Sequence, residues 1–247
     1  MEHYNVIDFH SHILPGIDDG SHDVATSVAM LQEMKKQGVA HCVATPHFYS
    51  YRRSLETFVA QREAAWQSLR PALTEDLPAV HLGAEVALFS GLADLSEEEL
   101  RLLCIDGTRT MLLEMPFAAW GDYEVDVVAR LSIDCDIRVV LAHLERYLPL
   151  QNRSSYLERI LALPVQVQIN AESLSGGLAN LRLRRQVLQL FESGQAHLLG
   201  SDCHDLRHRP PNLQMGRDTL QKHLGTEILS RMDDLGTSLL LQEVGII

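Results

Sequence analysis

Seven short apolar segments recur along the chain, each followed by a helix-like segment, and this rhythm constrains the fold most. Parallel strands need long crossover connections, which the intervening helices supply. The pattern predicts an α/β protein with one domain over residues 1–247, a single (β/α)7, distorted TIM-like barrel. The expected strands are residues 4–9, 42–44, 79–84, 110–113, 138–142, 165–169 and 196–200.

Helical spacing of apolar residues fills the intervals between these strands. Asp23 is expected to cap the first helix and Gly38 to follow its end, and Asp94 or Ser96 is expected to cap the third. The expected helices are residues 23–37, 55–73, 95–103, 122–131, 154–161, 181–192, 214–223 and 227–233. Apolar residues 239–241 and 244–247 indicate the end of a docking helix or an interface patch, which permits a homo-oligomer.

His10 and His12 stand two residues apart where the first strand ends, and a carboxylate follows in the next loop. Side chains alternate across a strand, so both imidazoles point the same way and form a pair suited to a metal ion. An isolated pair of this kind also arises by chance. The pair becomes stronger evidence for a metal site because other strands also end in an imidazole or a carboxylate.

An imidazole or a carboxylate follows most of the expected strands, and carboxyl ends of parallel strands meet at one face of a barrel. Nine candidate ligands are too many for one ion and suit a cluster of three. Imidazoles and carboxylates without thiolates favour manganese, iron or zinc. For any single residue, the alternative is a hydrogen-bonded core histidine or a helix-capping acid. The candidates are His10, His12, Asp19, His47, Glu85, Glu114, His143, Asp202 and His204.

Two arginines indicate the substrate of such a site. Arg146 lies three residues after His143 and Arg209 five after His204, so both are expected at the rim of the same face. Guanidinium groups match phosphate oxygens, and clustered metal ions support hydrolysis. The alternative for each arginine is a surface salt bridge, with Glu145 or Asp205. Weaker candidates for a positive rim are Arg52, Arg53 and Arg207.

The charge balance and the first residues restrict the partners and the compartment. The net charge of −12 argues against a nucleic-acid partner, which needs a basic face. Residues 1–4 form no secretory signal, and the four cysteines show no paired spacing, so a cytoplasmic protein is expected. No apolar run approaches the roughly 20 residues that span a bilayer, and membrane insertion is not expected.

These motifs resemble the PHP (polymerase and histidinol phosphatase) superfamily. Within it, the chain is similar to the bacterial manganese-dependent protein-tyrosine phosphatases of capsular and exopolysaccharide operons. The resemblance spans residues 7 to about 209. It is carried by DFHSHILPGIDDG (8–20), ATPH (44–47), GAE (83–85), LEMP (113–116), AHLER (142–146) and GSDCH (200–204).

The resemblance implies a phosphoesterase with three divalent ions, manganese first and iron or zinc as alternatives, which activate a hydroxide for attack on phosphorus. Arg146 and Arg209 would hold the phosphate, and the substrate would be phosphotyrosine on a cognate tyrosine kinase of polysaccharide synthesis. Asp18 could replace Asp19, although the position next to Gly20 matches better. The implied ligand sets are His10, His12, Glu85 and Asp202, then Glu85, Glu114 and His143, then Asp19, His47 and His204.

Three departures from the family pattern concern the protein substrate. Phe48 replaces a second histidine found in many relatives, Val86 and Ala87 replace polar or aromatic residues, and Glu172 stands where small hydroxylic residues are usual. Glu172 would either cap a helix or repel a phosphate. One alternative function is therefore hydrolysis of a small phosphomonoester such as histidinol phosphate. Another is a non-catalytic, metal-binding scaffold, which predicts missing ligands.

Cys203 and Arg209 have the Cys-x5-Arg spacing of thiol-dependent tyrosine phosphatases. Those enzymes need a loop whose backbone N–H groups wrap the phosphate and lower the thiol pKa. The five intervening residues contain no glycine, and the flanking Asp202 and His204 would turn the thiol away from the metals. Cys203 is therefore expected to be a small buried residue.

Overall fold

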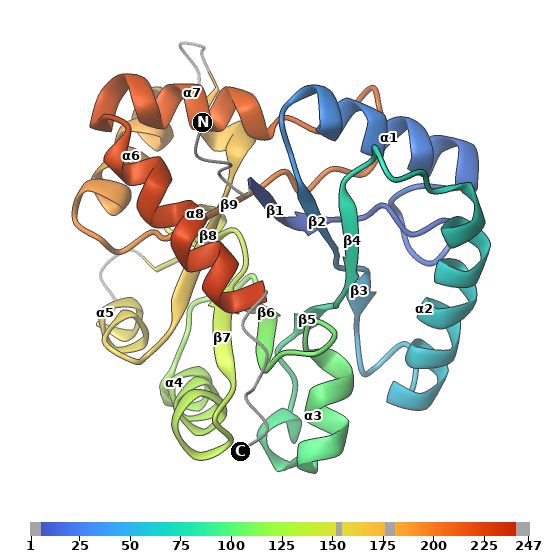
Figure 1. The fold of residues 1–247 in the computed structure, drawn as a ribbon. Coiled ribbons are helices and arrows are strands. Elements are labelled where there is room, and N and C mark those ends of the chain that lie inside the picture. Colours follow the sequence, from blue (N-terminus) through green and yellow to red (C-terminus); the bar gives the residue numbers. More distant parts are fainter. Residues whose placement is uncertain (1–5, 152–154, 176–180, 241–247) are drawn as a thin grey trace, which may run out of the picture.

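A computed structural model describes residues 6–151, 155–175 and 181–240. A curled parallel sheet lies at the centre and helices surround it (Figure 1). The described part of the chain has nine strands where seven were expected. They are β1 (Ile7–Ser11), β2 (His41–Ala44), β3 (His47–Phe48), β4 (Ala79–Leu82), β5 (Glu85–Ala87), β6 (Thr110–Glu114), β7 (Arg138–Leu141), β8 (Gln166–Asn170) and β9 (Leu198–Gly200).

Two short strands that were not expected, β3 and β5, follow the expected strands 42–44 and 79–84 and account for the difference. Pro46 has no N–H to donate and separates β2 from β3, while Gly83 begins the gap between β4 and β5. The two neighbouring segments stay paired through the bends, because Gly83 N–H donates to Ala44 O (2.8 Å) and Glu85 N–H donates to Pro46 O (3.1 Å). The hydrogen-bonded orders β1-β2-β4 and β3-β5-β6-β7-β8-β9 therefore follow one curved path.

The prediction of a complete (β/α)7 barrel is confirmed only in its coarser form, an α/β fold with a curled parallel sheet. β1 and the chain after β9 share a single isolated bridge, Ser11 with Cys203, rather than a full ladder. The reason is local, because Asp202, two residues after the end of β9, adopts a left-handed conformation (φ 51°) and turns the chain. Asp202 N–H still donates to His10 O (2.8 Å), so the two edges approach each other where the site residues lie.

The helices agree with the expected ones in position and differ mainly at their ends. Asp23 Oδ1 accepts a hydrogen bond from Thr26 N–H (2.7 Å), and Gly38 has a φ of 79°, so both predicted end signals are confirmed. Ser96, rather than Asp94, caps α3. The helices are α1 (Val24–Lys36), α2 (Leu55–Leu69), α3 (Glu97–Leu103), α4 (Asp122–Ala129), α5 (Tyr156–Leu161), α6 (Leu181–Glu192), α7 (Leu213–Leu224) and α8 (Glu227–Leu240).

Helix α8 runs seven residues beyond its expected end and crosses the starts of the strands (Figure 1). Thr110, the first residue of β6, donates from its hydroxyl to Leu239 O (2.8 Å). Leu239 and Leu240 are buried, so this part of the apolar C-terminal stretch is a docking helix end. Residues 241 and 244–247 lie outside the described residues.

A buried ion pair joins α7 to α8. Both guanidinium nitrogens of Arg217 bind the carboxylate of Asp233, at 2.6 and 2.8 Å. Gly236 lets α8 pack closely on β1, because a Cβ at this position would stand 3.0 Å from the ring of Phe9.

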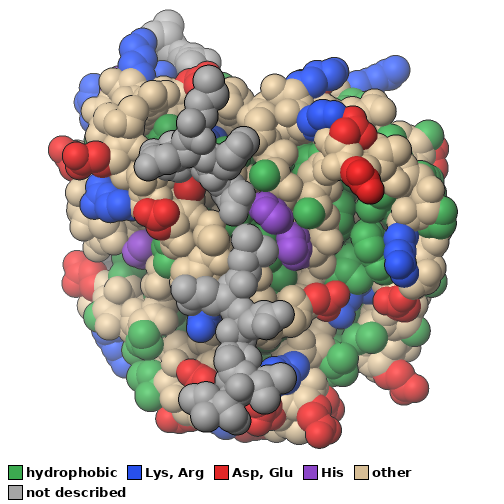
Figure 2. All heavy atoms as spheres, viewed as in Figure 1, with side chains coloured by type: hydrophobic (Ala, Val, Ile, Leu, Met, Phe, Trp, Pro, Cys, Tyr) green, Lys and Arg blue, Asp and Glu red, His purple; other side chains and the backbone are tan. Residues whose placement is uncertain are grey.

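On the face viewed in Figure 2, acidic and basic side chains are interspersed. Among the described residues, none of the helices has the length and apolarity needed to cross a bilayer.

A histidine pair on neighbouring strands, outside the set of candidate ligands, gives the fold a pH-dependent element. His41 Nδ1 and His81 Nε2 lie 3.0 Å apart on β2 and β4, and both rings are half-buried. Burial lowers the pKa of both imidazoles, and together with the nearby His41 it lowers that of His81 to about 4. The unfolded chain therefore binds protons below about pH 6.5 that the folded chain does not, and acid destabilises the fold.

We expect His81→Gln to remove part of this acid sensitivity. The free energy of unfolding of the variant, relative to the unmodified protein, should rise by roughly 1 kcal/mol between pH 8 and pH 5, after allowance for solvent screening of a partly exposed group. Urea denaturation at both pH values measures the difference. His22→Gln, at an exposed position, is the matched control and should show no such change. An equal response of both variants would contradict the prediction.

Candidate metal centre

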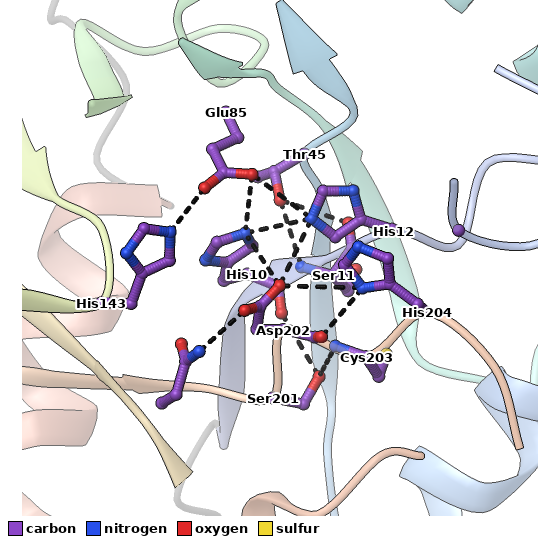
Figure 3. Close-up of polar contacts among 12 residues, drawn as sticks. His10, Ser11, His12, Thr45, Glu85, His143, Ser201, Asp202, Cys203 and His204 are labelled. Atoms are coloured by element: carbon purple, nitrogen blue, oxygen red, sulfur yellow. Dashed lines mark hydrogen bonds and ion pairs between the residues drawn. The ribbon is translucent and has the colours of Figure 1, made fainter. Parts of the chain in front are cut away.

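The strands bring all nine predicted ligands to one place, although they come from seven segments of the chain. In Figure 3, six of them point toward one another, from β1 and the residue after it, from β5, and from the segments after β7 and β9. Among the described residues, four overlapping groups have ligand atoms close enough to share an ion. The groups are His12, Asp19, His47 and His204, then His10, His12 and Asp202, then His10, Glu85 and His143, then His47, Glu85 and Glu114.

The innermost group consists of His10, His12 and Asp202, with Glu85 beside them, and its ligand atoms are spaced as in a metal site. The Nε2 atoms of His10 and His12 are 3.1 Å apart, and each lies 3.3–3.5 Å from Glu85 Oε2 and Asp202 Oδ1. Two ligand atoms that each lie about 2.1 Å from an ion in tetrahedral geometry are about 3.4 Å apart, so these pairs of atoms have the spacing of zinc ligands. The residues present therefore fit a cation at this position.

Glu85 connects this group to its neighbours. Its Oε2 faces His10, His12 and His47 (2.7 Å to His47 Nδ1), and its Oε1 lies 2.8 Å from His143 Nε2. Burial alone would raise the pKa of Glu85, but the surrounding imidazoles outweigh burial and hold the pKa well below its usual range. Glu85 is thus a buried carboxylate whose two oxygens serve different groups, as a bridging ligand requires.

Glu114 lies at the outer edge of the same cluster. Its Oε1 is 3.9 Å from His143 Nε2. Burial, followed by the negative charge of Glu85, raises the pKa of Glu114 to about 7. Two acids that share a site in this way repel each other, and a cation between them would remove the repulsion.

The two aspartates of the first loop have different roles in the structure. Asp19 Oδ1 lies 3.3 Å from His47 Nε2 and 3.6 Å from His204 Nε2, so it belongs to the third predicted set. Asp18 Oδ2 instead lies 2.8 Å from His12 Nδ1, on the far side of that ring from Nε2, and accepts from the His47 backbone N–H (3.0 Å). The geometry favours Asp19 as the ligand and Asp18 as the residue that orients His12.

Sequence reasoning missed the residues that hold the ligands in place. Gln168 Oε1 lies 3.2 Å from His10 Nδ1 and accepts from His143 N–H (2.9 Å). Asn170 donates from Nδ2 to Asp202 Oδ2 (2.7 Å). Their signal was present in the sequence, because both continue the polar-apolar alternation of the strand before Ala171.

Asp8 is another buried residue that holds the ligand-bearing segments in place. Its Oδ1 accepts from the backbone N–H groups of Ser201 (2.8 Å) and His10 (3.3 Å). Burial raises the pKa of Asp8 to about 6 despite these hydrogen bonds. Asp8 therefore fastens the chain after β9 to β1, beneath the ligands that these two segments carry.

Both predicted arginines lie beside the cluster, and Asp202 is their common partner. Arg209 Nη2 is 2.5 Å and Arg146 Nη1 is 3.6 Å from Asp202 Oδ2, and Arg209 Nη1 is 2.8 Å from His204 Nε2. The alternative side-chain pairs with Glu145 and Asp205 do not appear among the ion pairs of the described residues. A cleft of about 410 Å³ adjoins them, lined in part by both arginines, Asp202, Ser201 and Asn170.

Two acids besides Asp202, Glu145 and Glu172, line this cleft. Glu145 is buried, and its Oε1 accepts from the Ser173 hydroxyl (3.0 Å). Burial raises the pKa of Glu145 to about 7. Glu172, one of the departures in the sequence, is exposed in the turn Ala171–Leu174 and also lines the cleft. An anion entering here therefore meets both signs of charge.

Two of the weaker rim candidates, Arg52 and Arg53, have other contacts. The guanidinium of Arg52 lies over the rings of Tyr49 and Tyr51, and Arg53 donates to Gln61 Oε1 (2.6 Å). Tyr49 itself reaches the cluster, because its hydroxyl is 3.2 Å from His47 Nδ1. These contacts indicate one arginine–aromatic loop next to His47 rather than a set of free charges.

Cys203 has none of the features of a nucleophile. The residue is buried, and burial followed by the nearby Asp8 raises its thiol pKa well above the ordinary value. Its backbone contributes instead, because Cys203 O accepts from His12 N–H (2.9 Å). The prediction of a small buried residue is confirmed.

Comparison with known proteins identifies the family of the chain. Residues 6–235 match the family model described as capsular polysaccharide synthesis, CpsB/CapC. The chain is 31% identical to tyrosine-protein phosphatase YwqE of Bacillus subtilis over 226 residues (90% of this chain, 87% of the relative). It is 28% identical to tyrosine-protein phosphatase CpsB of Streptococcus pneumoniae over 234 residues (90% and 92%).

A solved structure agrees with this match. The chain superposes on a crystal structure from work on YwqE and CpsB, described as unique metal-dependent tyrosine phosphatases, with a TM-score of 0.81 and 29% identity. The match covers 98% of this chain and 96% of the other. The expected family relationship is confirmed, and the chain belongs to the CpsB/CapC family of capsular polysaccharide synthesis proteins.

Proposed function

We propose that this protein is a metal-dependent protein-tyrosine phosphatase. The observation that carries the proposal is the contact of Asp202 with both sides of the site: Oδ1 belongs to the innermost ligand group and Oδ2 binds Arg146 and Arg209. A phosphate held by the two guanidinium groups would therefore lie next to the metal positions. The relatives named as tyrosine phosphatases support this choice of substrate.

The ion content we propose is three divalent cations, manganese or else iron or zinc. His10, His12, Glu85 and Asp202 would hold the first, Glu85, Glu114 and His143 the second, and Asp19, His47 and His204 the third. Bound ions would supply Lewis acidity, lowering the pKa of a water and stabilising charge that develops on phosphate oxygens. The finer fold assignment that we propose is a distorted (β/α)7 barrel, and the ions would lie at the carboxyl ends of its strands.

The chain's own residues would bind and orient the substrate. Arg146 and Arg209 present planar donors to the non-bridging phosphate oxygens. Asp18, Gln168 and Asn170 keep the ligand rings and carboxylates in position through hydrogen bonds. The phenol of tyrosine has a pKa of about 10, so its phenolate is a good leaving group and the reaction does not depend strongly on a general acid.

The proposed biological substrate is a phosphotyrosine protein, a cognate tyrosine kinase of capsular or exopolysaccharide synthesis in the cytoplasm. Hydrolysis of a small phosphomonoester such as histidinol phosphate is the second candidate, and the acidic Glu172 in the cleft favours testing it. A non-catalytic scaffold predicts missing ligands, whereas all nine are present in this chain.

Hydrolysis of a phosphotyrosine peptide with added manganese tests the proposal. We expect Cys203→Ser to retain activity within a few-fold, because the thiol is buried and has no chemical role. We expect Arg209→Ala to lose about a hundredfold or more in kcat/KM, because a charged donor to the transition state is removed. Activity that survives removal of divalent ions, or that disappears in Cys203→Ser with fold and metal content intact, would contradict the mechanism.

The metal content of two variants tests whether Asp19 is a ligand and Asp18 the residue that orients His12. Asp19→Asn should bind one ion fewer per chain, because the third set loses its carboxylate. Asp18→Asn should keep the full number of ions with affinity weakened by roughly 10–100-fold, because the His12 ring loses its orienting partner. Elemental analysis after equilibrium dialysis measures both. Full metal content in Asp19→Asn together with a lost ion in Asp18→Asn would reverse the assignment.

A further inference from the structure

Phe117 is an exposed aromatic residue that contacts the candidate site without belonging to any ligand group. It follows the end of β6 by three residues and remains 52% exposed. Its ring is stacked on that of His143, with centroids 5.9 Å apart and an interplanar angle of 27°. The guanidinium carbon of Arg146 lies 5.1 Å from the centre of the same ring. Phe117 thus touches a predicted ligand and a predicted phosphate-binding residue together.

The ring is held in place by buried aromatic residues. Tyr147, which is fully buried, lies 4.9 Å from the Phe117 ring, and Trp120, which is also buried, lies 5.4 Å from Tyr147. Trp120 is fixed in turn, because its indole N–H donates to Pro116 O (3.1 Å). A half-exposed phenyl ring on such a support loses little entropy when a ligand packs against it.

We propose that Phe117 is a specificity-determining residue that packs against the aromatic ring of an aryl phosphate. The inference rests on the proposed function and names the part of the site that selects phosphotyrosine over alkyl phosphates. In an aryl phosphate one ester oxygen separates the phosphorus from the ring. A phosphate held by Arg146 therefore brings the substrate ring close to the aromatic surface on which that guanidinium lies.

The main competing explanation is that Phe117 only positions Arg146. A cation above an aromatic face is attracted to it, so loss of the ring would leave the guanidinium less ordered. That effect would weaken every phosphate ligand alike. Direct packing against the substrate ring would weaken only ligands that carry a ring.

Two non-hydrolysable ligands separate these explanations. Benzylphosphonate resembles phenyl phosphate with CH2 in place of the ester oxygen, and methylphosphonate has the same charged group without the ring. Calorimetric titration of the manganese-loaded protein gives both dissociation constants without requiring turnover. The variants are Phe117→Ala, Phe117→Trp as the conservative replacement, and Tyr123→Ala as a control at an exposed aromatic residue of α4.

We expect Phe117→Ala to weaken benzylphosphonate binding about fivefold and to change methylphosphonate binding by less than twofold. Phe117→Trp should restore the preference for the aryl ligand, and Tyr123→Ala should bind as the unmodified protein does. An equal loss for both ligands in Phe117→Ala would overturn the inference and assign Phe117 to positioning Arg146. An unmodified protein that binds both phosphonates equally would also overturn it.

The proposed function has a separate readout in the same experiment. If the unmodified protein with manganese hydrolyses phosphotyrosine peptide while the selectivity is independent of Phe117, only the inference fails. If it neither hydrolyses the peptide nor binds either phosphonate, the proposed function fails and the inference fails with it.

Discussion

The site depends on one buried negative charge, the carboxylate of Glu85. Removing such a charge from water costs several kcal/mol unless opposite charge surrounds it. Here three imidazoles face Oε2 and a fourth faces Oε1, and the pKa of Glu85 remains low. Burial would lower the pKa of His10 and His12, but the neighbouring carboxylates raise it, so in the absence of an ion these imidazoles supply the compensating positive charge. Imidazole binds a metal only in its neutral form, so a bound cation would displace these protons and supply the positive charge in their place.

The same hydrogen bonds that shape the sheet also position the ligands. Asp8 fastens the chain after β9 to β1, and Asp202 N–H donates to His10 O. These contacts bring together residues almost 200 positions apart, and they place Asp202 between the ligand group and the two arginines. A change in this junction would therefore affect stability, metal affinity and phosphate binding at the same time.

Local rules in the sequence were sufficient where a residue's role depends on its own segment. Asp23 and Gly38 delimit α1 as capping preferences predict, and Cys203 is buried as its flanking ligands indicated. The same rules left two caps open for α3, because Asp94 and Ser96 are each followed by a glutamate three residues later. The structure selects Ser96, which forms the reciprocal capping box with Glu99, whereas Asp94 belongs to the preceding turn Leu92–Asp94. The break at Gly83 was unrecognised, since a bend that preserves strand pairing leaves little trace in apolar periodicity.

The sequence by itself determined the α/β class, the family and the nine candidate ligands, because parallel strands place their carboxyl ends at one face and the residue types there are unusual. Only the tertiary structure decided how these side chains lie relative to one another. It placed Asp19 beside His47 and His204 and Asp18 beside His12, gave Glu85 its central position, and placed Gln168, Asn170 and Phe117 next to the candidate ligands. The physical reason is that these relative positions depend on distances of a few ångströms between atoms of different strands, which spacing along one strand does not specify.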